Sequence, residues 1–108
     1  MTALRASTWD GGSYDDPSDA DLYRLLTDLD QDDEDAPYFI IDRLGRPEFY
    51  AQVMSMSGTL LVEHREGSAD QHFHVFESDL RTVHRGLAAW SHESAGWRTA
   101  LDWQPGMP

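Results

Sequence analysis

The middle of this 108-residue chain holds four strand-like segments that follow one another through tight turns. Each segment either alternates apolar with polar residues or is rich in β-branched and aromatic side chains, as strands are. The four segments are Tyr38–Ile41, Phe49–Met56, Thr59–Glu66 and His72–Phe76. Because short connections join antiparallel neighbours, these segments predict a β-meander.

Two segments with helical periodicity flank these strands. The first, about Ser18–Asp30, opens with Ser18 and Asp21 at the spacing of a capped helix start. Its leucines recur at helical spacing, at Leu22, Leu25, Leu26 and Leu29. The second helix is predicted to be capped by Ser78 and repeats apolar residues in the same way, at Leu80, Val83, Leu87 and Trp90. Each helix has one apolar face, which must be buried against the sheet.

The predicted order of elements is (β)-α-β-β-β-β-α, in which the first strand is a short alternating segment from Leu4 to Thr8. We expect an α+β fold, an antiparallel β-meander of four to five strands with two helices packed on one face. With 40% hydrophobic residues, the chain can bury one modest core, so residues 1–108 are predicted to form a single domain. Trp97–Trp103 is expected to be a short helical turn or an edge strand, and the tail 104–108 is expected to be frayed.

Composition excludes several classes of protein. Twenty acidic residues and eight arginines give a formal net charge of -12 at pH 7, which leaves no basic footprint for a nucleic acid. The absence of cysteine excludes disulfides, thiolate metal ligands and a cysteine nucleophile. No apolar stretch is long enough for a signal-peptide core or a transmembrane helix. We therefore expect a soluble, cytoplasmic protein with no nucleic-acid and no membrane partner.

Acidic residues are concentrated in one quarter of the chain. Between Asp10 and Asp35 there are eleven of them and a single base, Arg24. Such a run attracts a basic protein partner. A flexible acidic loop is predicted near residues 28–36, and four aspartates in it are candidate partner contacts: Asp28, Asp30, Asp32 and Asp33. A merely solvated surface beside a helix is the alternative interpretation.

A pair of histidines raises the question of a metal site. His72 and His74 are two residues apart on a strand, so they project to one face, with Glu77 close by in the sequence. With His64 on the preceding strand, they suggest a small metal-dependent enzyme as an alternative function. However, the step from His74 to Glu77 is too short for a cupin metal box, and the later histidine of that motif is absent. We predict no metal site, no cofactor and no catalytic residue.

Charged residues alternate at the end of the third predicted strand. Because successive side chains point to opposite faces, Glu63 can pair with Arg65 on one face and His64 with Glu66 on the other. These charges are candidate partner contacts as well as a structural network. Two tryptophans near the C-terminus can pack in the core or anchor an interface: Trp97 and Trp103.

Several of these segments together carry a family resemblance. They are the strand end Leu60–Gly67 with its Glu-x-Arg-Glu-Gly pattern, Asp70–Phe73 after a short turn, a helix ending near Trp90, the closing Trp97 and Trp103, and the opening Trp9–Gly12. With the leucine-spaced first helix, they make the chain resemble the Imm1 family of bacterial immunity proteins over most of its length.

The resemblance implies a protein that is encoded beside a polymorphic toxin, often one with a deaminase-superfamily domain. Such a protein neutralises the toxin in the cytoplasm by direct contact, so it is a binding protein and not an enzyme. Its partner would be a cognate toxin with a basic surface. A homo-oligomerising scaffold module that uses the exposed face of the meander or an edge strand is the remaining alternative, and the sequence leaves the oligomeric state open.

Overall fold

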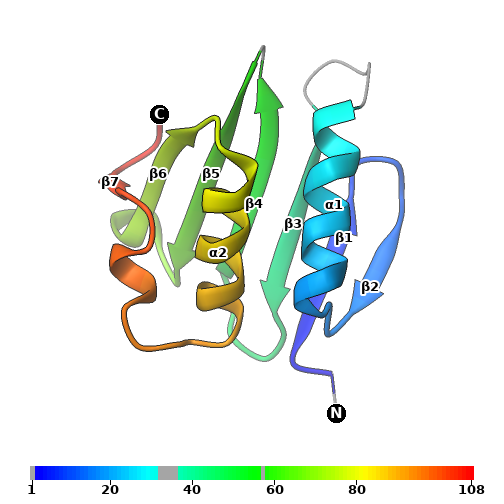
Figure 1. Cartoon of the computed structure of the whole chain (residues 1–108). Coiled ribbons are helices and arrows are strands. Elements are labelled where there is room, and N and C mark those ends of the chain that lie inside the picture. The colour runs from blue at the N-terminus through cyan, green and yellow to red at the C-terminus, as the bar shows by residue number, and fades with distance from the viewer. Residues whose placement is uncertain (1, 32–36, 57) are drawn as a thin grey trace.

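Seven strands form one antiparallel sheet in the computed structural model, which describes residues 2–31, 37–56 and 58–108 (Figure 1). Their order in the sheet is β2-β1-β3-β4-β5-β6-β7. The strands are β1 (Leu4–Thr8), β2 (Ser13–Asp15), β3 (Tyr38–Arg43), β4 (Phe49–Met56), β5 (Thr59–Glu66), β6 (His72–Glu77) and β7 (Gln104–Pro105). The helices are α1 (Asp19–Gln31) and α2 (Leu80–Ser91), with short 3-10 turns η1 (Ala69–Gln71) and η2 (Trp97–Thr99). The expected α+β class is confirmed, with more strands than predicted.

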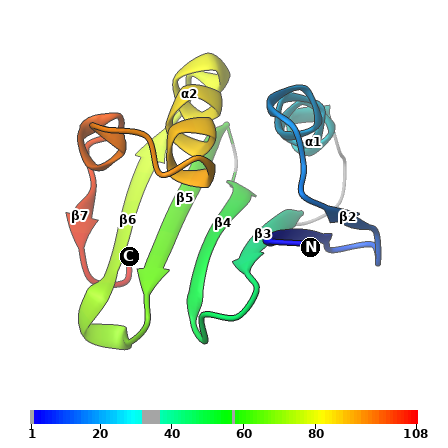
Figure 2. The same ribbon diagram turned by 90° about the horizontal axis from the view of Figure 1, so that it is seen from below.

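Both helices lie on the same side of the sheet. Figure 2 shows α1 over the half formed by β1 and β3, and α2 over the half formed by β5 and β6. The predicted leucine stripe of α1 and the apolar face of α2 are buried there against inward-facing strand residues. The largest contributors to this core are Leu22, Leu26, Leu29, Phe39, Ile41, Val53, Val62, Val83, Leu87 and Trp90. Neither α1 nor α2 lies on the opposite side of the sheet, which is called the open face below (Figure 2).

The starts of the two helices show how local chemistry sets their bounds. At α1 the Ser18 amide donates to the Asp21 carboxylate at 3.0 Å, and the Asp21 amide donates to the Ser18 hydroxyl at 3.1 Å, as the sequence predicts. The prediction that Ser78 caps α2 is wrong. Asp79 is the cap, because its carboxylate accepts from the Arg81 amide at 3.1 Å, while the Ser78 hydroxyl donates to Thr59.

The prediction of an acidic loop near residues 28–36 is wrong for residues 28–31, which are helical. Helix α1 continues to Gln31, so Asp28 and Asp30 belong to its last turns. Residues 32–36 lie outside the described residues. The apolar positions at Leu25, Leu26 and Leu29 extend the buried stripe to this end of the helix, which explains why the helix does not stop before the acids.

The two edge strands of the sheet were not predicted. The segment Asp10–Gly12 closes a hairpin between β1 and β2, in which Gly11 has φ +91°. The tail predicted to be frayed is partly ordered, because β7 pairs with β6 and the Gly106 amide donates to the His72 carbonyl at 2.7 Å. For the segment Trp97–Trp103, the helical alternative is the one observed, as η2.

Gly86 holds α2 close to the segment that follows it. A Cβ atom at this position would lie 2.6 Å from two side-chain carbons of Leu101. Leu101 is itself buried in the core, so it packs directly on the helix backbone. The glycine that weakens the helix by its conformational freedom is thus required for close packing.

Candidate partner-binding site

The predicted contact residues on β5 divide between the two faces of the sheet. His64 lies opposite Phe73 on β6, and it points to the helix side together with Glu66. Glu63 and Arg65 lie opposite His74 and His72 and point to the open face. The alternation of faces was predicted correctly, but the two predicted charge pairs were not.

On the helix side, Glu66 binds an arginine from a distant part of the chain. Both terminal nitrogens of Arg98 donate to its carboxylate, at 2.9 and 2.5 Å. This hydrogen-bonded pair holds the pKa of Glu66 below its ordinary value. The Arg98 guanidinium also lies 4.4 Å from the centre of the Trp97 ring. The predicted pair of His64 with Glu66 is therefore wrong, because Arg98 supplies a permanent charge in bidentate geometry.

His64 is instead enclosed by aromatic rings. Its ring stacks on Phe73 at 4.9 Å and meets the edges or faces of Trp97 and Trp103 at 5.0 and 4.4 Å. The side chain is 2% exposed, and burial lowers the pKa of His64 from 6.5 to about 4. Trp97 and Trp103 are half-buried against the core. Both tryptophans therefore pack the C-terminal segment onto the sheet.

On the open face, Glu63 and His72 are nearly buried, at 7% and 1% exposure. Nε of Arg65 donates to Nδ1 of His72 at 3.1 Å, so this nitrogen carries no proton and the proton of a neutral ring lies on Nε2. Nε2 in turn lies 3.6 Å from Oε1 of Glu63. Arg65 also pairs with Glu48 at 3.0 Å, in place of the predicted pair with Glu63.

The residues suggested for a metal site do not meet. His72 and His74 share the open face, whereas His64 points to the helix side. Nδ1 of His74 lies 2.7 Å from the Gly106 carbonyl, and the Glu77 carboxylate accepts from the Asp79 amide at 3.0 Å. In residues 2–31, 37–56 and 58–108, no three histidine or acidic side chains gather closely enough to hold an ion.

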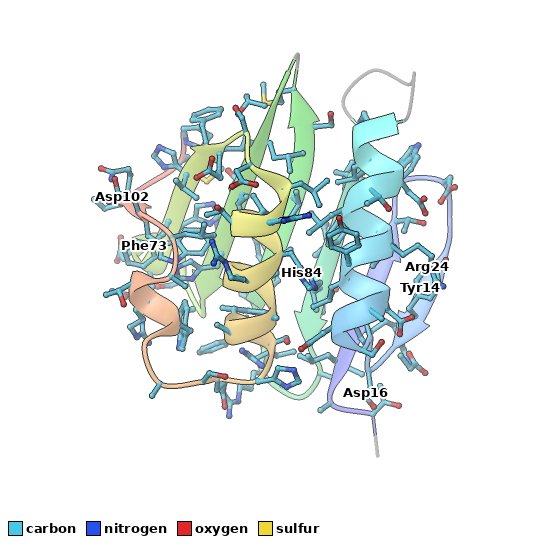
Figure 3. All side chains as sticks on the ribbon, viewed as in Figure 1. Tyr14, Asp16, Arg24, Phe73, His84 and Asp102 are labelled. Carbon is cyan, nitrogen blue, oxygen red and sulfur yellow. The ribbon has the colours of Figure 1, made fainter. Side chains whose placement is uncertain are left out.

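The acidic residues gather along β2 and α1. Figure 3 shows Tyr14, Asp16 and Arg24 on this side of the molecule, and Phe73 and Asp102 at the other end of the sheet. Several of the acids bind partners within the chain: Asp15 with Arg5, Asp16 with the Ala3 and Leu4 amides, Asp19 with His92, and Asp21 with Ser18 and Arg24. Three carboxyls in this region have a pKa below the ordinary value because they accept hydrogen bonds. The donors are the Thr8 side chain for Asp10, the Leu4 amide for Asp16 and the Ser18 amide for Asp21. The sequence predicted the charge and the pairing of Asp21 with Ser18, but not the other structural roles.

Of the four aspartates chosen as partner contacts, Asp28 is exposed on α1. It lines a shallow groove of about 380 Å³ together with Trp9, Asp10 and Tyr14, between the β1–β2 turn and the helix. The helix backbone includes Asp30 in its last turn. Asp32 and Asp33 lie outside the described residues. This acidic region and the Trp97–Trp103 segment are at opposite ends of the sheet, so they do not form one continuous site (Figure 1).

One line of apolar side chains on the open face was missed by the sequence analysis. Cross-strand neighbours Tyr38, Met54, Leu61 and Phe76 form a line across four strands of the open face, called the apolar row below. A signal for it was present in the sequence, because β3 and β5 each contain adjacent apolar residues, which places apolar side chains on both faces.

Comparison with known protein families, with curated proteins and with solved structures found no match for this chain. Neither helix described in the structure has the length and apolar composition needed to cross a lipid bilayer.

Proposed function

We propose that this protein is an immunity protein that binds a cognate toxin domain with a basic surface and neutralises it in the cytoplasm without catalysis. The observation that carries the proposal is the grouping of the acidic residues along β2 and α1 of a chain with a net charge of -12. A toxin that acts on nucleic acid needs a basic substrate groove. A rigid domain that presents carboxylates can occupy such a groove.

The structural roles of the acids support this proposal. Asp10, Asp16 and Asp21 are fixed by hydrogen bonds and have lowered pKa values, so they stay charged at neutral pH. A charged surface that is already ordered loses little conformational entropy when a partner binds. The field of such a surface accelerates the encounter with an oppositely charged partner, and this acceleration declines as salt is added.

The test uses the toxin domain encoded beside this chain's gene. We replace Asp28, Asp30, Asp32 and Asp33 together by Asn and measure association by stopped flow at low and high salt. The variant is expected to fold normally and to associate about tenfold more slowly at low salt, since removing charge on one partner affects mainly the on-rate. The difference should become small near 1 M salt, where the Debye length is about 3 Å.

The matched control is Asp70→Asn combined with Asp102→Asn, which removes exposed charges from η1 and from the far end of the sheet. Per charge removed, the control should slow association much less. If both variants slow association equally per charge removed, the acidic region acts only through the net charge of the protein and is not a specific docking surface. No binding of the wild-type protein to the toxin domain, and no protection of cells that express it, would refute the proposed function.

A further inference from the structure

The open face carries an apolar surface in an otherwise strongly charged molecule. The apolar row runs across β3, β4, β5 and β6, and Met56 extends it toward the β4–β5 turn. Phe76 is 51% exposed and Met56 is 40% exposed. Leu61 is buried, yet it lies outside the core cluster because it faces away from the helices. A contiguous apolar patch with a polar border is a recurrent mark of a protein-binding surface.

A buried carboxylate lies directly beside the apolar row. Glu63 occupies the next position along β5 on the same face, with Gln52 and His74 as its cross-strand neighbours. Its side chain is 9% exposed, and no hydrogen bond to it is found within the described ranges 2–31, 37–56 and 58–108. The nearest cation-forming atom is Nε2 of His72, at 3.6 Å. A buried carboxylate without a strong donor favours an added cationic group.

Farther along the open face, carboxylates also outnumber guanidinium groups. Beyond the apolar row and the line of Glu63 with its neighbours, a third line of side chains crosses the open face. It contains Arg5, Asp15, Asp42, Tyr50, Arg65 and His72. Arg65 is bound to Glu48, which lies beyond this third line. With Glu63, these described residues contribute four carboxylates and two guanidinium groups. An apolar row beside this excess of carboxylates is complementary to a partner with an apolar centre and a basic border.

We propose that the open face is the central contact surface for the toxin, in which apolar side chains of the toxin cover the apolar row and a lysine or arginine approaches Glu63. This inference rests on the proposed function and identifies the surface that would bind the toxin. The acidic region on β2 and α1 then guides the encounter, while the open face supplies the lasting contacts. Buried apolar and aromatic groups at the centre of an interface carry most of its affinity.

A second copy of this chain is a poorer occupant than a basic protein. Two copies would bring together two molecules that each have a net charge of -12. Each would also present an excess of carboxylates on the contacting face. A basic partner removes this repulsion and provides the cation for Glu63.

The first variant is Phe76→Ser, tested against the toxin domain encoded beside this chain's gene. Because Phe76 is half exposed, its removal should leave the fold intact, as checked by circular dichroism and thermal unfolding. The affinity should fall at least about tenfold, mainly through faster dissociation. Leu44→Ser is the matched control, because Leu44 is also an exposed large apolar residue but lies after β3, in the turn to β4. It should bind like the wild type.

The second variant, Glu63→Gln, keeps the shape of the side chain and removes its charge. It should weaken binding several-fold more than Asp70→Asn, which removes one exposed charge from η1. Methyl spectra of methionine-labelled protein provide a measurement that does not depend on a variant. The Met54 and Met56 signals should shift when the toxin is added, because both side chains are on the open face.

The possible outcomes separate this inference from the proposed function. If the wild type binds the toxin, but Phe76→Ser and Glu63→Gln bind equally well and the methionine signals do not move, the open face is not the interface and the function stands. If the wild type does not bind the toxin at all, both fail. Light scattering that gives twice the mass of 12.3 kDa for the wild type and the single mass for Phe76→Ser would assign the face to a second copy instead.

Discussion

His64 and His72 lie on neighbouring strands, β5 and β6, but on opposite faces of the sheet. His64 is enclosed by the rings of Phe73, Trp97 and Trp103, and burial lowers its pKa to about 4. His72 is equally buried but lies between the Arg65 guanidinium and the Glu63 carboxylate.

The difference shows that the two faces of this sheet are stabilised by different interactions. The helix side excludes water with apolar and aromatic groups, so a charged imidazole is disfavoured there. The open face buries polar groups beside one another: Arg65 donates to Nδ1 of His72, and the Glu63 carboxylate lies 3.6 Å from Nε2 of the same ring. Its apolar side chains Phe76 and Met56 stay partly exposed. Truncation of an apolar side chain should therefore have a larger effect on the helix side. Loss of a polar partner should have a larger effect on the open face, where the polar groups are more deeply buried.

The largest effect is expected for Leu26→Ala on the helix side. Leu26 is fully buried between α1 and the sheet, so its loss removes apolar contacts and leaves a cavity. The free energy of unfolding should fall by about 2–5 kcal/mol in urea denaturation. Met56→Ala on the open face should cost under about 1 kcal/mol, because Met56 is already partly in water. Equal losses would mean that the open face is as tightly packed as the core.

A pH dependence from His64 should be the next largest effect. The unfolded chain takes up a proton at this imidazole near pH 6.5, whereas the folded protein keeps it neutral down to about pH 4. The free energy of unfolding should therefore fall as the pH is lowered from 6.5 toward 4, by up to about 3 kcal/mol. Urea titrations at several pH values measure this slope.

The variant His64→Leu should flatten the slope between pH 6.5 and 4.5, since it removes the group that titrates. His92→Gln is the control, because His92 is exposed and pairs with Asp19 at the surface. A wild-type protein whose stability is constant over this range would show that water or a charge reaches His64.

The smallest effects compare two arginines on opposite faces. Arg65→Met should lower the free energy of unfolding by about 1–3 kcal/mol, because it removes the donor to Nδ1 of the buried His72 and breaks the ion pair with Glu48. Arg98→Met should cost less than about 1 kcal/mol, since the Arg98 side chain is mostly exposed although it binds Glu66 in bidentate geometry. The reverse order would mean that the pair on the helix side is the more important one.

The sequence predicted the parts of the fold that depend on local periodicity. The four central strands, the first strand and both helices follow from apolar spacing, and the Ser18–Asp21 cap follows from a short motif. The two edge strands could not be predicted in this way. Strand β2 has only three residues, and β7 is held by a hydrogen bond to His72, far away in the sequence.

The candidate site shows the same limit. Period-two alternation placed Glu63 and Arg65 on one face, but it could not give their partners. Arg65 binds Glu48, 17 residues away, and Glu66 binds Arg98, 32 residues away. Such pairs form only after the sheet and the C-terminal segment are assembled, so no local pattern marks them.

The short edge strands have a consequence for how this chain meets other chains. A long, flat edge offers a row of backbone groups to which a foreign strand can be added, and growth of this kind leads to fibrils. Here one edge is the three-residue β2, with Asp15 at its end, and the other is the two-residue β7, whose Pro105 has no N–H to donate. Both edges are therefore poor templates for further pairing. We therefore expect other molecules to recognise this protein through its side chains instead of extending its sheet at β2 or β7.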